Sequence, residues 1–366
     1  MTQINQSLRL NSMSTKSRTR KLTGLGFLAL FMGCLFALVF LPTPYVIERP
    51  GPVFDVLGKD NGTQVITIED AKSYPTTGRL DVLTVSVAGN REDTPSWAEL
   101  AMAWLDPAQA VVPLDVMFPA NVSTSQVNAE STAMMEESQQ DAIAAALTKL
   151  GYTVPWHVYV SEVTKGGASS GKLVAADFVI KINGIDVKDI DQMRSVINKQ
   201  ALLGPLKVEV LRNGAKAVET ITALKDKDGK YRLGILAGYK YDFPVKVKLE
   251  LGDVGGPSGG MMFALGIIDR LTPGSLTGGK HIAGTGTIDP AGNVGPIGGI
   301  RHKLFGAARA GATIFLAPDS NCDEVVGHVP SGLTVVKVKT LSEAKADLEK
   351  IATGTKPETL PTCTAK

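Results

Sequence analysis

The chain has 366 residues, a formal net charge of +2 from 38 basic and 36 acidic side chains, and 44% apolar residues. This length suits about two domains of roughly 100–200 residues each, and the apolar content argues against a disordered chain. No long basic block occurs in the body of the chain, so the charge pattern predicts no nucleic-acid partner.

The chain begins with a polar tail, residues 1–21, followed by an uncharged apolar run, residues 22–41. Twenty helical residues are about long enough to cross a bilayer. Four cations directly precede the run: Lys16, Arg18, Arg20 and Lys21. A cleaved signal peptide is the alternative, but the run exceeds a typical apolar signal region and no clear A-x-A site follows it. We expect a single-pass anchor in the cell membrane, with a cytoplasmic N-terminus and the rest of the chain outside the cytoplasm.

Residues 42–154 begin with prolines at 42, 44, 50 and 52, which predict a stiff stalk. Strand-like runs follow at 65–68 and 80–87. The stretch 89–136 has no pattern that assigns it a structure. Residues 137–150 predict an alanine-rich helix that stops at Gly151.

Residues 155–224 form a separate pattern: a strand, a Gly/Ser loop, a strand closed by Asn183-Gly184, a helix over 190–198 and a strand over 206–211. The run resembles a PDZ domain of bacterial envelope proteases, which carries A-x-x-G-K/L and D-x-I-x-x-I-N-G. The matching residues are Ala168, Gly171, Lys172, Leu173, Asp177, Ile180, Ile182, Asn183 and Gly184. The resemblance implies binding of extended peptide ends by strand addition.

Residues 225–351 alternate strands and helices. Strands are predicted over 244–251, 313–317 and 334–338, helices over 258–271, 300–310 and 341–351, and a glycine-spaced strand and turn region over 284–299. The last helix opens with Thr340 and Glu343 in capping-box spacing. A tail follows at 352–366. The pattern predicts an α/β or α+β domain, and we expect the α+β class.

Ser258 lies within Gly255-Gly256-Pro257-Ser258-Gly259-Gly260, which suits either a surface turn or a nucleophile at the start of a helix. The stretch also fits the G-x-S-x-G elbow of α/β-hydrolases, which would need Asp289 or Asp319 with His328. Residues 252–255 separate the serine from the preceding strand, and no HGGG-type motif precedes it, so the elbow is disfavoured. Two P-loop spacings, at 166–172 and 274–280, lack the Ser/Thr that binds Mg²⁺, so no nucleotide is expected.

Lys303 is the candidate base for Ser258. It shares one face of the helix over 300–310 with Ile300, Leu304 and Ala307. A lysine on an apolar stripe either extends its ammonium to water or is desolvated. Desolvation lowers its pKa, so that a neutral amine becomes available as a general base.

Residues 252–351 resemble the proteolytic domain of Lon-type Ser-Lys peptidases. The motifs that carry the resemblance are GGPSGG around Ser258, TGTIDPAGNVGPIGGIRHKLFGAARAGA from Thr285, and IFLAPDSNCDEV. The resemblance implies that Ser258 is the nucleophile, that Lys303 is the catalytic lysine and that Thr285 lies near this lysine. It also implies an inserted PDZ domain, as in membrane-anchored Lon-like proteases without an ATPase domain, and a homo-oligomer, hexameric by the same resemblance.

Two positions depart from the Lon pattern. Gly255 stands where ATP-dependent members carry an acidic residue, and Thr287 replaces the Glu of their TGE motif. We expect an ATP-independent serine endopeptidase that acts on polypeptides. Gly256 and Gly259 are expected to support the oxyanion region, where backbone N–H groups at a helix start stabilise developing charge.

No metal or other cofactor is expected, because the cysteines and histidines lack ligand spacing. Cys322 and Cys363 are the only cysteines of the exported part, where oxidation is favoured, so they are predicted to form a disulfide. The alternatives to the Ser-Lys endopeptidase are a Ser-His-Asp hydrolase and a catalytically inactive PDZ scaffold.

Overall fold

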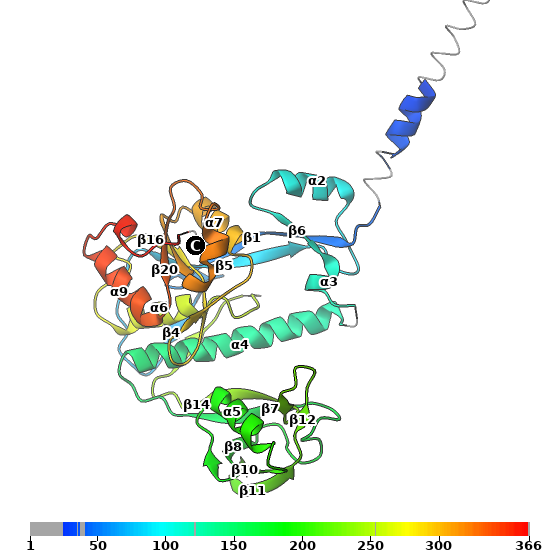
Figure 1. Cartoon of the computed structure of the whole chain (residues 1–366). Helices are drawn as coiled ribbons and strands as arrows, with labels where there is room; N and C mark the ends of the chain where they lie inside the picture. Colours follow the sequence, from blue (N-terminus) through cyan, green and yellow to red (C-terminus); the bar gives the residue numbers. More distant parts are fainter. Residues whose placement is uncertain (1–24, 35, 37–40, 121, 253, 365–366) are drawn as a thin grey trace, which may run out of the picture.

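The computed structural model describes residues 25–34, 36, 41–120, 122–252 and 254–364. Their fold is of the mixed α+β type and contains two larger sheets, each with its own hydrophobic core (Figure 1). The predicted cytoplasmic tail and part of the predicted anchor lie outside these residues. Residues 25–34 are helical, and no helix in the described ranges is both long and apolar enough to cross a membrane.

The first large sheet has the strand order β20-β19-β16-β5-β1-β6. Its strands are β1 (Tyr45–Asp55), β5 (Arg79–Ala88), β6 (Ala110–Pro113), β16 (His281–Gly284), β19 (Ile314–Pro318) and β20 (Thr334–Val338). Strands β5, β16, β19 and β20 are parallel, while β1 is antiparallel to both β5 and β6. The sheet therefore joins residues from both halves of the chain.

Alternating residues of this sheet enter two different cores. Leu80 and Val82 of β5 pack on one face with α4 (Thr124–Lys149), α6 (Gly260–Leu271) and α9 (Leu341–Ala352). Leu83, on the opposite face, packs with α7 (Ile300–Arg309) and α8 (Cys322–Val325). This period of two is the ordinary consequence of strand geometry, and it places α6 and α7 on opposite faces of the sheet.

The prolines near residue 50 lie in a strand and not in a stalk. Pro50 and Pro52 belong to β1, which pairs with β5 through a register shift between Pro50 and Val53. Strand β6 pairs with β1 only as far as Glu48, so the prolines lie where β1 is an edge. Proline lacks an N–H donor and is tolerated at edges and bulges, which explains why this segment can join the sheet.

The stretch 89–136, which the sequence left unassigned, contains α2 (Trp97–Leu105), β6, α3 (Leu114–Met117) and the first half of α4. Helix α4 begins at Thr124, well before the predicted start at 137. Ser123 and Gln126 form a capping box at its start, and its exposed first half is polar. A helix without an apolar stripe gives no periodic signal, which is why the prediction began too late.

The second large sheet has the strand order β11-β10-β8-β7-β14 and packs against α5 (Ile190–Gln200). Its strands are β7 (Trp156–Val163), β8 (Phe178–Ile182), β10 (Leu206–Arg212), β11 (Ala215–Ile221) and β14 (Ile235–Tyr241), and β9 (Ile185–Asp186) pairs with β8. We call residues 156–241 the inserted module. It extends past the predicted boundary at 224, because β14 returns to pair with β7.

The two ends of the inserted module lie side by side. Tyr241, the last residue of β14, is the register partner of Trp156, the first residue of β7. Tyr241 also donates a hydrogen bond of 2.6 Å to Asp141 of α4. Figure 1 shows α4 between the inserted module and the first sheet. Helix α4 is therefore the element of contact between the two parts.

Short elements complete the fold. Two-stranded pairs are formed by β2 (Lys59–Asp60) with β3 (Thr63–Gln64), β4 (Ile66–Ile68) with β15 (Val247–Leu249), β12 (Leu224–Lys225) with β13 (Tyr231–Arg232), and β17 (Thr287–Ile288) with β18 (Val294–Gly295). The 3₁₀ turns are η1 (Asp319–Asn321) and η2 (Pro357–Thr359). The strand expected over 244–251 is thus only three residues long, Val247–Leu249.

Candidate active site

Ser258 lies between β15 and the start of α6, in a turn that depends on glycine. Gly256 has a φ of +82°, a conformation that residues with a side chain rarely adopt. A Cβ on Gly259, the N-cap of α6, would lie 2.8 Å from Val82 and 3.0 Å from Phe263. The glycines therefore allow the turn and let the start of α6 pack directly on the core.

Lys303 comes from the opposite face of the sheet, on α7. Its side chain is 2% exposed, and its helix neighbours Ile300, Leu304 and Ala307 are fully buried, as the apolar stripe predicted. Gly299 precedes α7 with a φ of +67°, and a Cβ there would lie 2.9 Å from Val85. The close packing of α7 on β5 holds the lysine inside the protein.

Ser258, Lys303 and Thr285 meet just beyond the end of β16. The Nζ atom of Lys303 lies 2.7 Å from Ser258 Oγ and 2.9 Å from Thr285 Oγ1, both within hydrogen-bonding distance. Thr285 is fully buried and donates a hydrogen bond of 2.9 Å from Oγ1 to the carbonyl oxygen of Ser258. The same carbonyl accepts the N–H of Gly286 at 2.8 Å. Thr285 therefore fixes both the lysine and the backbone of the serine.

Burial lowers the pKa of Lys303 to about 7, from the usual value near 10.5. The physical cause is desolvation, which penalises the ammonium form. Among the residues that the structure describes, no carboxylate forms an ion pair with this lysine to offset that penalty. A neutral amine in hydrogen-bonding contact with a serine hydroxyl can accept its proton near neutral pH.

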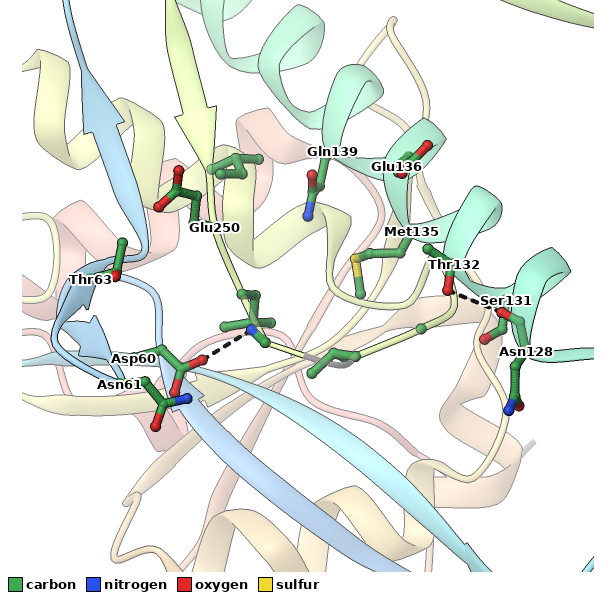
Figure 2. Close-up of a pocket in the computed structure, with 15 residues that line it drawn as sticks. Asp60, Asn61, Thr63, Asn128, Ser131, Thr132, Met135, Glu136, Gln139 and Glu250 are labelled. Carbon is green, nitrogen blue, oxygen red and sulfur yellow. Dashed lines mark hydrogen bonds between the residues drawn. The ribbon is translucent and has the colours of Figure 1, made fainter. Parts of the chain in front are cut away.

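Ser258 and Lys303 open onto a cavity of about 450 Å³ between β5 and the segment before α6. A larger hollow of about 960 Å³ adjoins it and shares Met135, Val254 and Gly255 with it. Figure 2 shows this larger hollow, with Met135 and Gln139 of α4 on one side and Asp60 and Thr63 on the other. We call the two adjoining hollows together the groove, and Ser258 lies in its smaller part.

Helix α4 supplies contacts to the serine turn that the sequence did not reveal. Ser138 donates a hydrogen bond of 2.8 Å to the carbonyl of Pro257, and the carbonyl of Ser131 accepts the N–H of Gly256 at 2.8 Å. A Cβ on Gly260 would lie 2.8 Å from Ser138 Oγ. These residues lie in or beside the part of α4 that lacks an apolar pattern, so only their proximity in space identifies them.

The residues that a Ser-His-Asp triad would need do not meet at Ser258. No histidine in the described part of the chain lines the cavity. His328 Nδ1 lies 3.1 Å from the carbonyl of Val326, and Asp289 accepts the side-chain amide of Asn293 at 2.7 Å. Asp319 pairs with Lys337. Within the described ranges, no three His, Cys, Asp or Glu side chains are placed to hold a metal ion.

Cys322 and Cys363 are joined in a disulfide, with their Cα atoms 5.0 Å apart. Cys322 begins α8, and Cys363 packs beside the core that contains Leu333 and Val335. The bond ties the C-terminal segment to the face of the sheet that also carries α7.

Comparison with known proteins relates part of the chain to Lon proteases. Residues 208–350 match the family profile of the Lon protease (S16) C-terminal proteolytic domain. Lon protease 2 of Herpetosiphon aurantiacus is 33% identical over 178 residues, which cover 46% of this chain and 21% of that protein. Lon protease 1 of Bacillus subtilis is 31% identical over 140 residues, which cover 37% of this chain and 17% of that protein. The matched segments thus span about a fifth of the length of these relatives.

Among solved structures, the PDZ domain of an SdrC-like protein from Listeria innocua aligns with 24% identity and a TM-score of 0.21, covering 22% of this chain and 92% of that one. The PDZ domain of an SdrC-like protein from Listeria monocytogenes aligns with 22% identity and a TM-score of 0.21, covering 22% and 86%. The family match and the Lon relatives together support a serine endopeptidase of the Lon type, whose proteolytic domain the chain resembles over residues 208–350.

Proposed function

We propose that the chain is a membrane-anchored, ATP-independent endopeptidase that cleaves polypeptides outside the cytoplasm with a Ser258–Lys303 dyad. One observation carries this proposal above the others. The amine of Lys303 is buried, has a pKa of about 7 and lies 2.7 Å from the hydroxyl oxygen of Ser258. A desolvated lysine beside a serine on a groove is one arrangement that activates a serine nucleophile.

In the proposed reaction, Ser258 Oγ attacks the carbonyl carbon of the scissile peptide bond while Lys303 Nζ takes the hydroxyl proton. Nζ then gives this proton to the leaving amine as the C–N bond breaks, which leaves an ester on Ser258. Water, deprotonated by the same amine, hydrolyses the ester and frees the serine. Thr285 keeps the amine directed at Ser258 through both steps, because it accepts a hydrogen bond from Nζ.

The oxyanion that forms during attack needs donors near Ser258. We propose the N–H groups of Ser258 and Gly259, neither of which bonds to a backbone acceptor among the described residues. They lie at the N-terminal end of α6, where the helix dipole favours negative charge. Gly259 has no side chain to obstruct the substrate carbonyl.

The test uses the full chain in detergent, with casein and a short fluorogenic peptide as substrates and no nucleotide present. Ser258→Ala and Lys303→Ala are expected to abolish cleavage, and Lys303→Arg also, because a guanidinium stays protonated. The kcat/KM of the wild type is expected to rise with pH around an apparent pKa of about 7. Full activity in Lys303→Ala, or its loss in a folded His328→Ala protein, would instead favour a triad. A wild type without any cleavage would leave only a scaffold role.

The membrane anchor is proposed on the sequence of residues 22–41 and the cations before it. Reporter fusions after residue 60 test it. Activity of a periplasmic-type or surface reporter is expected, and activity of a cytoplasmic reporter would contradict the orientation. The oligomeric state, proposed to be a ring of like subunits on the strength of the Lon resemblance, is measured by light scattering of the detergent-solubilised chain.

We propose that the inserted module captures extended peptides and controls their access to the groove. A cavity of about 350 Å³ lies between α5 and the start of β14, bordered by Ile190, Met193 and Leu236. Helix α4 links the two parts, since it contacts the serine turn through Ser138 and the module through Asp141. A peptide that changes the position of β14 would therefore act on the helix that supports Ser258.

The module is tested by deletion of residues 157–240, with a short Gly-Ser linker between Trp156 and Tyr241, which the adjacency of these two residues allows and which keeps the hydrogen bond from Tyr241 to Asp141. Cleavage of casein is expected to fall while cleavage of the short peptide is retained or rises. Leu236→Asp, at an exposed position of the cavity wall, is the matched point variant and should reproduce the casein defect. If neither change affects either substrate, the module has no part in capture or control.

A further inference from the structure

Helix α2 is apolar on both of its faces. Its sequence is WAELAMAWL, and Leu100 and Ala103 are buried against Ile47 of β1. The outward residues are apolar as well: Met102 is 69% exposed, Trp104 66% and Leu105 79%. A helix on the surface of a soluble protein normally carries polar residues on its outer face, and one that is apolar all round is normally covered.

The only charged residue of α2 is already engaged. Glu99 accepts hydrogen bonds from the N–H and the hydroxyl of Ser96 in the capping box. It therefore serves the start of the helix and does not supply a polar outer face. The outer surface is left to Ala98, Ala101, Met102, Trp104 and Leu105.

Both short helices are fixed to the residues that directly follow the apolar run. Pro42 forms a bridge with Ser96, the N-cap of α2. Thr43 donates to the carbonyl of Pro95 at 2.7 Å, and this bond is buried. The first residue of α3, Leu114, donates its N–H to the carbonyl of Pro44 at 2.9 Å.

The end of the run at Leu41 is therefore one residue from the cap of α2. A nine-residue helix is only about 14 Å long, so no part of α2 lies far from that point. Figure 1 shows α2, β6 and α3 at the end of the sheet where the N-terminal segment enters. If residues 22–41 cross a bilayer, the bilayer surface lies beside these helices.

We propose that the outer surface of α2, formed by Met102, Trp104 and Leu105, rests in the interfacial region of the bilayer that holds the anchor. This inference rests on the proposed anchor. Apart from Glu99 in its first turn, the exposed side chains of α2 carry no charge, and its tryptophan is of the residue type that prefers the membrane–water interface. A second contact with the bilayer, beside the anchor, would restrict the orientation of the catalytic part toward the membrane.

The experiment uses the full chain in phosphatidylcholine proteoliposomes, with and without brominated acyl chains that quench tryptophan on contact. The chain has three tryptophans, and Trp104→Phe removes one of them while keeping an apolar surface. The brominated acyl chains are expected to quench part of the tryptophan emission of the wild type. This quenching is expected to be largely lost in Trp104→Phe. Trp156→Phe is the matched control, because Trp156 is 42% exposed in the inserted module and should not contribute to quenching.

A quenched emission that is unchanged in Trp104→Phe would overturn the inference. Extraction with alkaline carbonate separates this outcome from failure of the anchor: a retained chain with unquenched Trp104 overturns the bilayer contact alone, while release of the chain overturns both. Leu105→Asp, measured by light scattering in detergent, tests for a protein partner. A change of oligomer size there would assign the surface to subunit contact, whereas an unchanged size with reduced quenching supports the bilayer.

Discussion

Replacement of Lys303 by methionine tests whether the amine is desolvated in the resting protein. Methionine has a similar length and no charge, so it suits the apolar surroundings of Ile300, Leu304 and Ala307. The pKa of Lys303 is about 7 in the folded protein and returns to roughly 10.4 on unfolding. Between these values the unfolded lysine holds a proton that the folded one has released, so unfolding takes up a proton and stability rises with pH.

The size of the effect follows from these two pKa values. Each pH unit within the window adds up to about 1.4 kcal/mol to the free energy of unfolding. Half of the folded molecules are still protonated at pH 7, so the gain of the wild type over Lys303→Met between pH 7 and pH 9 is about 2 kcal/mol. Below pH 7 both states hold the proton, and the difference between the two proteins should stop changing.

The assay is urea unfolding of the two full-length proteins in mild detergent at pH 7 and pH 9, followed by near-ultraviolet circular dichroism. Comparison of wild type with Lys303→Met cancels the other titrating groups. Ser258→Ala is the control, because it is expected to lose activity but keeps the lysine, and it should retain the dependence on pH. A stability difference between wild type and Lys303→Met that is constant from pH 7 to pH 9 would refute the desolvated amine.

Three further predictions concern the support of the site. Thr285→Val should lower kcat at least tenfold and the free energy of unfolding by about 1–2 kcal/mol, since it removes the hydrogen bonds to Lys303 and to the Ser258 carbonyl. Peptide kinetics and thermal unfolding measure these effects, and a kcat equal to that of the wild type would contradict the positioning role. Gly299→Ala should destabilise by about 1–2 kcal/mol, because φ is +67° and Val85 is close, while Gly298→Ala, which meets nothing within 4 Å, should be neutral. Reduction of the Cys322–Cys363 disulfide, which closes a sequence separation of 41, should cost up to about 4 kcal/mol with the activity of the folded protein unchanged, as measured by unfolding with and without reductant.

Local pattern was enough to predict some elements. The stripe of Ile300, Leu304 and Ala307 predicted α7 and placed Lys303 on its apolar face. Whether the amine reached water was left open by the pattern, and the structure buries it. The glycines around Ser258 predicted a helix start, which lies two residues later at Gly260. These signals are strong because burial imposes a period on the residues of a single element.

Other features depended on contacts between distant parts of the chain. The start of α4 at Thr124 was missed because its exposed half has no apolar stripe. The end of the inserted module was set too early, since β14 is recognised only by its pairing with β7. The hydrogen bond from Thr285 to the carbonyl of Ser258 follows from the meeting of β16 and the α6 turn, which no local pattern encodes.

The pairing of Trp156 with Tyr241 also has a consequence for the order of folding. The first sheet needs β5 to pair with β16, a contact between residues that lie about 200 positions apart, as in Leu80 with Ile282. Contacts of such high separation are slow to form, because the chain between them must be confined. Once the inserted module has folded, its two ends lie one strand spacing apart, about 5 Å. The folded module then connects the flanking segments of the chain as a short loop would. Early folding of the module should therefore speed the pairing of β5 with β16 in the first sheet.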